Sequence, residues 1–143
     1  MPVTIYEFGY HGRSEEAFVE QVRADSRRVV VDVRYGFIGG ARPFSQRRLQ
    51  AALPGQYRHV RALGNVNYLE REEPIELADP ARGVEVILSL VNEGRTPVLI
   101  CTCRDLRRCH RRIALAEIER ARADIRVVPF ALPDGEEQGL LFD

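Results

Sequence analysis

The most reactive side chains of this sequence gather in one segment, "LICTCRDLRRCHRRIALAEI", which runs from Leu99 to Ile118. The segment holds all three cysteines of the chain, one of its three histidines and five arginines. Thiols and imidazoles act as nucleophiles, proton carriers and metal ligands, and guanidinium groups bind phosphates. The segment begins in an apolar run and ends in a helical pattern. In α/β proteins functional groups collect at such places, because ligands bind where strands end and helices begin.

Four interpretations of this segment stay open. The thiols can be small core residues beside a solvated face of arginines. They can bind zinc together with His110, although C-x-C-x5-C-H lacks the usual paired ligands and neighbouring residues on a helix diverge by about 100°. The C-x5-R spacing from Cys101 to Arg107 suggests a thiol-dependent phosphatase or sulfur-transfer loop, but this loop has no glycine and contains Asp105. Finally, arginines and histidines can hold a phosphate or a nucleotide.

The rest of the chain alternates between strand and helix patterns. β-Branched and apolar runs predict strands at 4–8, 28–34, 56–63, 96–101 and 125–130, and helical spacing predicts helices at 15–25, 45–53, 81–94 and 105–122. Ser14 and Ser45 are expected N-caps, and Gly94 is an expected C-cap. This alternation predicts an α/β fold: a single three-layer domain over residues 1–130, with a mainly parallel sheet flanked by helices. Residues 131–143 are expected to form a flexible tail.

The last predicted helix determines where the reactive side chains point. With Asp105 as its N-cap, Cys109 shares a face with Ile113 and Ala116, and His110 lies on a neighbouring face. Both side chains are therefore expected to point toward the sheet near a helix N-terminus, which favours anions and thiolates.

Composition limits the function classes. The 21 basic and 21 acidic groups cancel, so no global field draws the protein onto nucleic acid or an anionic membrane. Every basic residue is Arg, which excludes a Schiff-base lysine and a phosphate-binding lysine of the Walker type. No signal peptide or membrane-spanning run is found, and three clustered cysteines do not suggest a secreted disulfide framework. We therefore expect a cytoplasmic protein that has no membrane partner.

Several motifs of the chain are similar to those of one known family. They are "VDVR" followed by a loop with Pro, Phe and Ser, then "YRHVRALGN", and a strand ending in Cys with Cys-His-Arg eight residues later. Over most of residues 4–130 the chain resembles the DUF488 family of small α/β proteins. The resemblance implies an α/β fold and a set of recurring polar residues, but no reaction. It rests on Asp32, Arg34, Phe44, His59, Leu63, Gly64 and the pattern Cys101-x7-Cys109-His110-Arg111.

Three positions depart from the family pattern. The family usually has Gly-His-Ser after the first strand, where this chain places Tyr10 in the His position and His11 one residue later. Cys103 stands where the family has Glu, and Asn65 stands where it has a second loop glycine. Any role of that glutamate as a general base or a ligand therefore does not carry over to this chain.

Polar residues at the ends of several predicted strands are expected to surround one pocket. Asp32 and Arg34 are two residues apart on one strand, so both side chains project from the same face at its carboxyl end. There they form either a structural ion pair or a ligand clamp. The predicted pocket is surrounded by His11, Asp32, Arg34, His59, Asn65, Cys101, Cys103, His110 and Arg111.

These residues divide into ligand-binding and catalytic candidates. Arg34, Asn65, Cys103 and Arg111 are expected to bind a phosphate-bearing ligand or nucleic acid, and the candidate catalytic residues are His11, Asp32, His59, Cys101 and His110. The predicted function is an anion-, nucleotide- or nucleic-acid-binding protein of DNA metabolism or repair, acting on a phosphoester or nucleoside if it is a hydrolase. The alternatives are a non-catalytic DNA-associated module and a thiol-dependent or zinc-binding protein. The sequence identifies no cofactor.

The loop "GFIGGARPFSQRR" between the second strand and the second helix is expected to assist nucleic-acid binding. Its arginines Arg42, Arg47 and Arg48 accompany the aromatic residues Phe37 and Phe44. Aromatic rings stack on bases while arginines meet the backbone phosphates. An ordinary solvated connection is the alternative.

The C-terminal segment contains a short motif, Gln138-x-x-Leu141-Phe142. It resembles the peptide by which bacterial repair and replication proteins bind the DNA sliding clamp, which implies the clamp as a partner. Two apolar side chains fill a pocket of such a partner, and the glutamine can hydrogen-bond at its edge. Gly139 replaces the usual Leu and should weaken binding. The alternative is that this apolar end packs on the domain's own core.

Overall fold

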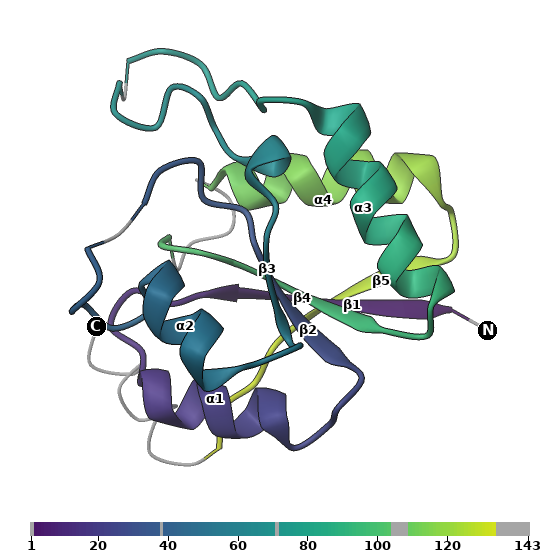
Figure 1. The fold of residues 1–143 in the computed structure, drawn as a ribbon. Helices are drawn as coiled ribbons and strands as arrows, with labels where there is room; N and C mark the ends of the chain where they lie inside the picture. The colour runs from purple at the N-terminus through teal and green to yellow at the C-terminus, as the bar shows by residue number, and fades with distance from the viewer. Residues whose placement is uncertain (1, 38, 71, 104–108, 134–143) are drawn as a thin grey trace.

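The computed structural model describes residues 2–37, 39–70, 72–103 and 109–133. Five strands form one sheet: β1 (Val3–Gly9), β2 (Arg28–Asp32), β3 (Tyr57–His59), β4 (Thr96–Cys101) and β5 (Ile125–Pro129). Their order is β3-β2-β4-β1-β5, and every pair is parallel (Figure 1). The predicted α/β fold with a parallel sheet is therefore confirmed.

The helices cover both faces of the sheet. Helices α1 (Glu15–Arg23) and α2 (Gln46–Ala52) pack on one face, and α3 (Pro80–Asn92) and α4 (His110–Ala121) pack on the other (Figure 1). A short 3-10 helix, η1 (Arg61–Leu63), follows β3 and occupies the end of the segment predicted as a longer strand. The three-layer architecture matches the sequence prediction. Among the described residues, no helix has the length and apolar character needed to cross a bilayer.

Local signals in the sequence explain most element boundaries. The hydroxyl of Ser14 accepts a hydrogen bond from the backbone of Ala17 at the start of α1, and Ser45 does the same at the start of α2. Gly94 adopts a φ of 81° just after α3, a conformation that glycine tolerates without steric cost. These three predicted caps are confirmed. Helix α3 begins one residue earlier than predicted, because Asp79 caps it.

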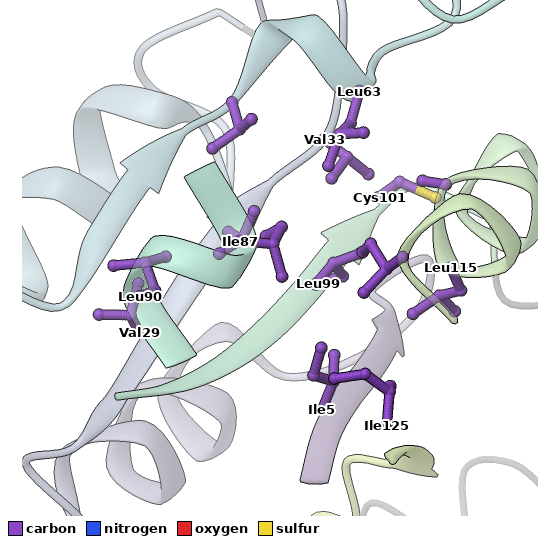
Figure 2. Packing of buried hydrophobic residues seen from close by; sticks show 14 of the residues in the cluster. Ile5, Val29, Val33, Leu63, Ile87, Leu90, Leu99, Cys101, Leu115 and Ile125 are labelled. Atoms are coloured by element: carbon purple, nitrogen blue, oxygen red, sulfur yellow. The ribbon is translucent and has the colours of Figure 1, made fainter. Parts of the chain in front are cut away.

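The core consists of two apolar layers, one on each face of the sheet. Val29 and Val31 point into the layer beneath α3 and α4, and Val30 between them points into the layer beneath α1 and α2. This alternation explains why β2 is a continuous run of valines. Figure 2 shows the first layer, with Cys101 at its edge where β4 ends. The carboxyl end of β4 is therefore packed from below by apolar side chains.

Helix α4 differs from its prediction. Its N-cap is Cys109, whose backbone is extended (φ −108°, ψ 143°), so the prediction of one helix from residue 105 is wrong at this position. The predicted cap, Asp105, lies outside the described residues. The buried face of α4 is formed by Arg111, Ala114, Leu115 and Ile118. Of the predicted set, Cys109 is buried as expected, but Ile113 is only partly buried and Ala116 is exposed.

Two boundaries near predicted sites also differ. Strand β2 ends at Asp32, so Arg34 lies in the loop that follows rather than on the strand. In the segment expected to form a tail, Leu132 is buried and packs in the apolar layer beneath α1 and α2. Residues 134–143 lie outside the described residues.

Candidate functional site

A pocket lies at the carboxyl ends of β2 and β4. These strands are neighbours, but the chain leaves β2 for α2 on one face of the sheet and leaves β4 for α4 on the other (Figure 1). Such diverging connections form a crevice in open α/β sheets. The pocket has a volume of about 720 Å³, and its lining includes Arg34, Tyr35, Phe37, Asn65, Tyr68, Glu70, Glu73, Cys101, Cys103 and His110.

Arg34, which lines this pocket, forms an ion pair with the buried carboxylate of Asp32 behind it. The guanidinium donates from Nε to Asp32 Oδ1 at 2.8 Å and from Nη2 to Oδ2 at 2.6 Å. Tyr57 donates its hydroxyl to the same Oδ2 at 2.7 Å. Burial and the Asp32 carboxylate raise the pKa of Tyr57. Burial opposes the charge of Arg34, but the hydrogen bonds and charge of Asp32 hold the pKa of the guanidinium above its usual value. The pair is therefore a satisfied buried salt bridge.

The network continues from Arg34 to β1 and β4. Arg34 Nη1 donates to the hydroxyl of Tyr10 at 2.9 Å, and that hydroxyl lies 2.8 Å from the Thr102 hydroxyl. The guanidinium carbon also lies 5.0 Å from the centre of the Tyr10 ring. Tyr10 thus connects the loop after β2 with the end of β4.

Two histidines fix the loop that follows β2. His59 Nε2 lies 2.6 Å from the carbonyl oxygen of Arg34, and His110 Nε2 lies 2.7 Å from that of Val33. A ring nitrogen that meets a carbonyl oxygen must carry the proton, so both rings donate through Nε2. Burial lowers the pKa of His110. In its neutral form the His110 ring therefore presents an unprotonated Nδ1.

The three thiols converge beside His110. Their sulfur atoms all lie within 4.8 Å of one another. Cys101 and Cys109 are buried, whereas Cys103 is exposed. The sulfurs of Cys101 and Cys109 are in bonding contact. The Cα atoms of these two residues are 7.9 Å apart, however, whereas the Cα atoms of a disulfide are usually about 4.4–6.8 Å apart. The backbone therefore directs all three cysteine side chains toward one point, but it separates Cys101 and Cys109 more widely than an ordinary disulfide does.

Arg111 lies beneath the thiols. Its Nη1 donates to Cys101 Sγ at 3.0 Å and to the carbonyl oxygen of Cys103 at 2.8 Å. On its other side the guanidinium forms an ion pair with Glu7 at 3.0 Å. Arg111 is fully buried and does not line the pocket. It holds the thiols in place from the core side.

The predicted site residues fall into three groups. Asp32 and His59 lie behind the pocket and hold Arg34, and Arg111 lies beneath the cysteines. His11 is exposed and does not line the pocket. The residues that do line it are Arg34, Asn65, Cys101, Cys103 and His110. The tail residues Gln138, Leu141 and Phe142 lie outside the described residues.

Two aromatic residues of the pocket, Tyr35 and Tyr68, were missed by the sequence analysis, whereas Phe37 was expected to stack on bases. Tyr35, Phe37 and Tyr68 all line the pocket, and Phe37 is 72% exposed. The guanidinium of Arg61 lies 4.0 Å from the centre of the Tyr35 ring and 5.9 Å from that of Phe37. The available signal was the placement of aromatic residues in polar loops, where burial does not explain them.

Two residues of the loop expected to assist nucleic-acid binding are engaged in contacts within the domain. Phe44, expected to stack on bases, is buried against Phe8, Phe18 and Tyr10, so this expectation is wrong. Arg48 is bound to Glu15 in an ion pair of 2.6 Å. Phe37 and Arg47 together line a second, shallower depression beside α2.

Comparison with known proteins places the chain in a family. The family model described as "Domain of unknown function DUF488" matches residues 14–118. The chain belongs to the DUF488 family. No curated protein and no solved structure matches the chain. The DUF488 match runs from the N-cap of α1 into α4, so it contains the Asp32 and Arg34 pair, the three cysteines and His110. Strands β1 and β5 lie outside it.

Proposed function

We propose that this DUF488 protein binds the base of a nucleotide, free or within single-stranded nucleic acid, in the pocket at the ends of β2 and β4. The observation that carries this proposal is the group of aromatic rings around a polar pocket: Tyr35, Phe37 and the half-exposed Tyr68. Bases of every kind stack on such rings, because each base has an apolar face. The Phe37 ring lies edge-on to that of His59, with 5.3 Å between the ring centres, but Phe37 remains 72% exposed, so burial in the core does not explain it.

The charges around the pocket favour one orientation of the nucleotide. Glu70 and Glu73 line the pocket, and their carboxylates repel a phosphate but accept hydrogen bonds from the amino group of a base. Arg61 is exposed and lies over the rings of Tyr35 and Phe37 at the rim. A base that enters the pocket therefore leaves its phosphate near this guanidinium.

The shallow depression beside α2 extends this surface. Phe37 lines both the pocket and the depression, and Arg47 lies in the depression. A single strand that crosses Phe37 can contact both Arg47, which lines the same depression, and Arg61, whose guanidinium lies 5.9 Å from the centre of the Phe37 ring. This arrangement favours single-stranded nucleic acid over a free mononucleotide as the ligand.

The state of Asp32 favours binding over acid–base hydrolysis. Its carboxylate is fully buried and accepts hydrogen bonds from the backbone and guanidinium of Arg34 and from Tyr57. A carboxylate so engaged is not placed to take a proton from a ligand in the pocket. We therefore propose a binding module, and place it in DNA metabolism only through the motif in the tail.

The test is a titration of the protein with short labelled single-stranded oligonucleotides. Phe37→Ala and Tyr68→Ala should each raise Kd by about 5- to 150-fold, the range that corresponds to about 1–3 kcal/mol per stacked base. Leu69→Ala is the matched control, since Leu69 is 79% exposed next to Tyr68 but does not line the pocket. Arg61→Gln should weaken binding and reduce its dependence on salt, whereas Arg126→Gln, an exposed arginine on β5, should not.

A second variant changes the shape of the pocket without removing a ring. A methyl group at Gly36 would lie 2.5 Å from the hydroxyl oxygen of Tyr68, so Gly36→Ala must displace that half-exposed ring. At Gly39 a methyl group meets nothing within 4 Å, so Gly39→Ala is its control. Equal affinities for the wild type and all pocket variants would show that nucleic acid does not use this pocket.

A further inference from the structure

All three cysteines of the chain meet at the end of β4, and they come from two separate segments. Cys101 is the last residue of the strand, Cys103 follows it, and Cys109 precedes α4. Their sulfur atoms lie within 4.8 Å of one another. Tetrahedral zinc at about 2.3 Å from each thiolate separates the sulfurs by about 3.8 Å. Small side-chain adjustments are therefore enough to place the three sulfurs around one ion.

A fourth donor lies beside the thiols. His110 Nδ1 is 4.0 Å from Cys109 Sγ, and its other nitrogen, Nε2, donates to the carbonyl oxygen of Val33. Histidines that bind metals almost always donate their second ring nitrogen to such an acceptor, which fixes the tautomer and the ring orientation. The sequence-based objection was that Cys109 and His110 diverge on a helix. It does not hold, because Cys109 is an N-cap with extended backbone.

The surroundings suit thiolates. Arg111 donates from Nη1 to Cys101 Sγ at 3.0 Å and to Cys109 Sγ at 3.5 Å, and its backbone N–H lies 3.4 Å from Cys109 Sγ. Three thiolates, one neutral imidazole and one divalent ion carry a net charge of −1. Arg111 directs hydrogen-bond donors at this charge while its guanidinium also pairs with Glu7. A disulfide between Cys101 and Cys109 fits this geometry less well, since their Cα atoms are 7.9 Å apart.

We infer that Cys101, Cys103, Cys109 and His110 form a tetrahedral site for a thiophilic divalent metal ion, with zinc as the best match to this donor set. Binding converts three thiols into thiolates and releases their protons, with no change in oxidation state. The ion links the end of β4 to the start of α4, beside the pocket. This inference does not depend on nucleotide binding.

The test measures the metal directly in the full-length protein. Protein purified in reducing buffer without chelator should hold one zinc ion per chain by elemental mass spectrometry. After removal of zinc, added Co²⁺ should give the intense near-ultraviolet charge-transfer band of thiolate ligands and the visible bands of tetrahedral cobalt. No bound zinc together with no such cobalt spectrum would overturn the inference, as would an intact Cys101–Cys109 disulfide in metal-free protein.

Variants assign the ligands. Cys103→Ser is the safest change because Cys103 is exposed, and it should lower the cobalt affinity by more than about tenfold, the loss typical even of an outer-sphere partner. His110→Asn should lower it as well. His11→Asn is the control, since His11 is exposed and, among the described residues, its ring makes no contact with a cysteine sulfur such as the one that His110 makes with Cys109. Unchanged cobalt affinity in both Cys103→Ser and His110→Asn would place the metal elsewhere and refute the site.

Discussion

At the scale of single residues, the chain keeps two arginine–carboxylate pairs beneath the pocket. Arg34 pairs with Asp32, and Arg111 pairs with Glu7. Ions with so little exposure are stable only when partners satisfy their hydrogen bonds, and removal of one partner costs much more than the pair itself contributes. Both pairs also hold parts of the site, since Arg34 lines the pocket and Arg111 contacts the thiols.

Tyr57→Phe tests the Asp32 network without changing a charge. The variant removes the hydroxyl that donates to Asp32 Oδ2 at 2.7 Å and leaves the ring in place. We expect the free energy of unfolding to fall by about 1.5–3 kcal/mol, as for a hydrogen bond to a charged group. Tyr6→Phe is the control, since the part of the chain described by the structure offers the Tyr6 hydroxyl no hydrogen-bond partner. It should change stability by less than about 0.5 kcal/mol.

Urea denaturation of both tyrosine variants at neutral pH provides the measurement. Equal loss in Tyr57→Phe and Tyr6→Phe would mean that the Tyr57 hydroxyl does not stabilise Asp32.

The sequence predicted the residues of the site better than their roles. Asp32 and Arg34 were expected to act together because their spacing places them on the same face, and they do pair. The direction of Arg111 was not predictable, because it depends on where α4 begins, and the burial of an arginine depends on a carboxylate from β1. Tyr35 and Tyr68 were missed because tertiary packing decides which aromatic side chains line a pocket.

At the scale of secondary structure elements, Glu15 joins α1 to the start of α2. Its carboxylate accepts the backbone N–H of Phe44 at 2.6 Å and the guanidinium of Arg48 at 2.6 Å. Phe44 has a φ of 66°, an unusual value for a residue with a bulky side chain. The Glu15 bond therefore holds the backbone in a conformation that the buried Phe44 ring requires.

The loss of stability caused by Glu15→Gln should depend on pH. The hydrogen bond and charge of Arg48, with the Phe44 N–H, lower the pKa of Glu15 below its ordinary 4.5 against the opposing effect of burial. The stability that Glu15 contributes is therefore present above pH 4.5 and is lost as the pH falls through its pKa in the folded state. We expect Glu15→Gln to cost about 1 kcal/mol near neutral pH, allowing for solvent screening, and less in acid.

The matched control for this change is Glu16→Gln. Glu16 is exposed in the same helical turn and shares the interaction with the helix dipole, but not the contacts with Arg48 and Phe44. Denaturation curves near pH 7 and near pH 3 should show the difference between the two variants shrinking in acid. A difference that persists unchanged at low pH would contradict the role of the Glu15 charge.

Element boundaries were predictable where a strong local signal exists. Serine caps and β-branched runs determined most of them, as at Ser14, Ser45 and β2. The start of α4 was not predictable, because aspartate is a much commoner N-cap than cysteine and Asp105 therefore outweighed Cys109.

At the scale of the whole molecule, the strand order β3-β2-β4-β1-β5 creates the pocket. The alternation of strands and helices indicated a parallel sheet, but no local pattern states which strands are neighbours. The structure was therefore needed to locate the crevice between β2 and β4. It also shows that residues within segments 34–37, 65–75 and 101–110 line the same pocket.

The tail prediction belongs to this scale because it concerns a partner of the complete protein. Titration of a bacterial sliding clamp with the full-length protein, and with a peptide of residues 134–143, should show binding that Leu141→Ala together with Phe142→Ala abolishes. The two apolar side chains are expected to provide most of the contact energy. Absence of binding by the native chain and peptide, or equal binding by the variants, would end this proposal and with it the link to DNA metabolism.

The position of β1 has a consequence for how the chain acquires its structure during synthesis. This first strand is flanked by β4 and β5, the last two, and it pairs with no other strand. During synthesis β1 must therefore wait for residues after 96 before either of these sheet partners exists. Contacts between distant segments form slowly. Until residues 96–101 have been synthesised, β1 therefore has neither of its two neighbours in the sheet.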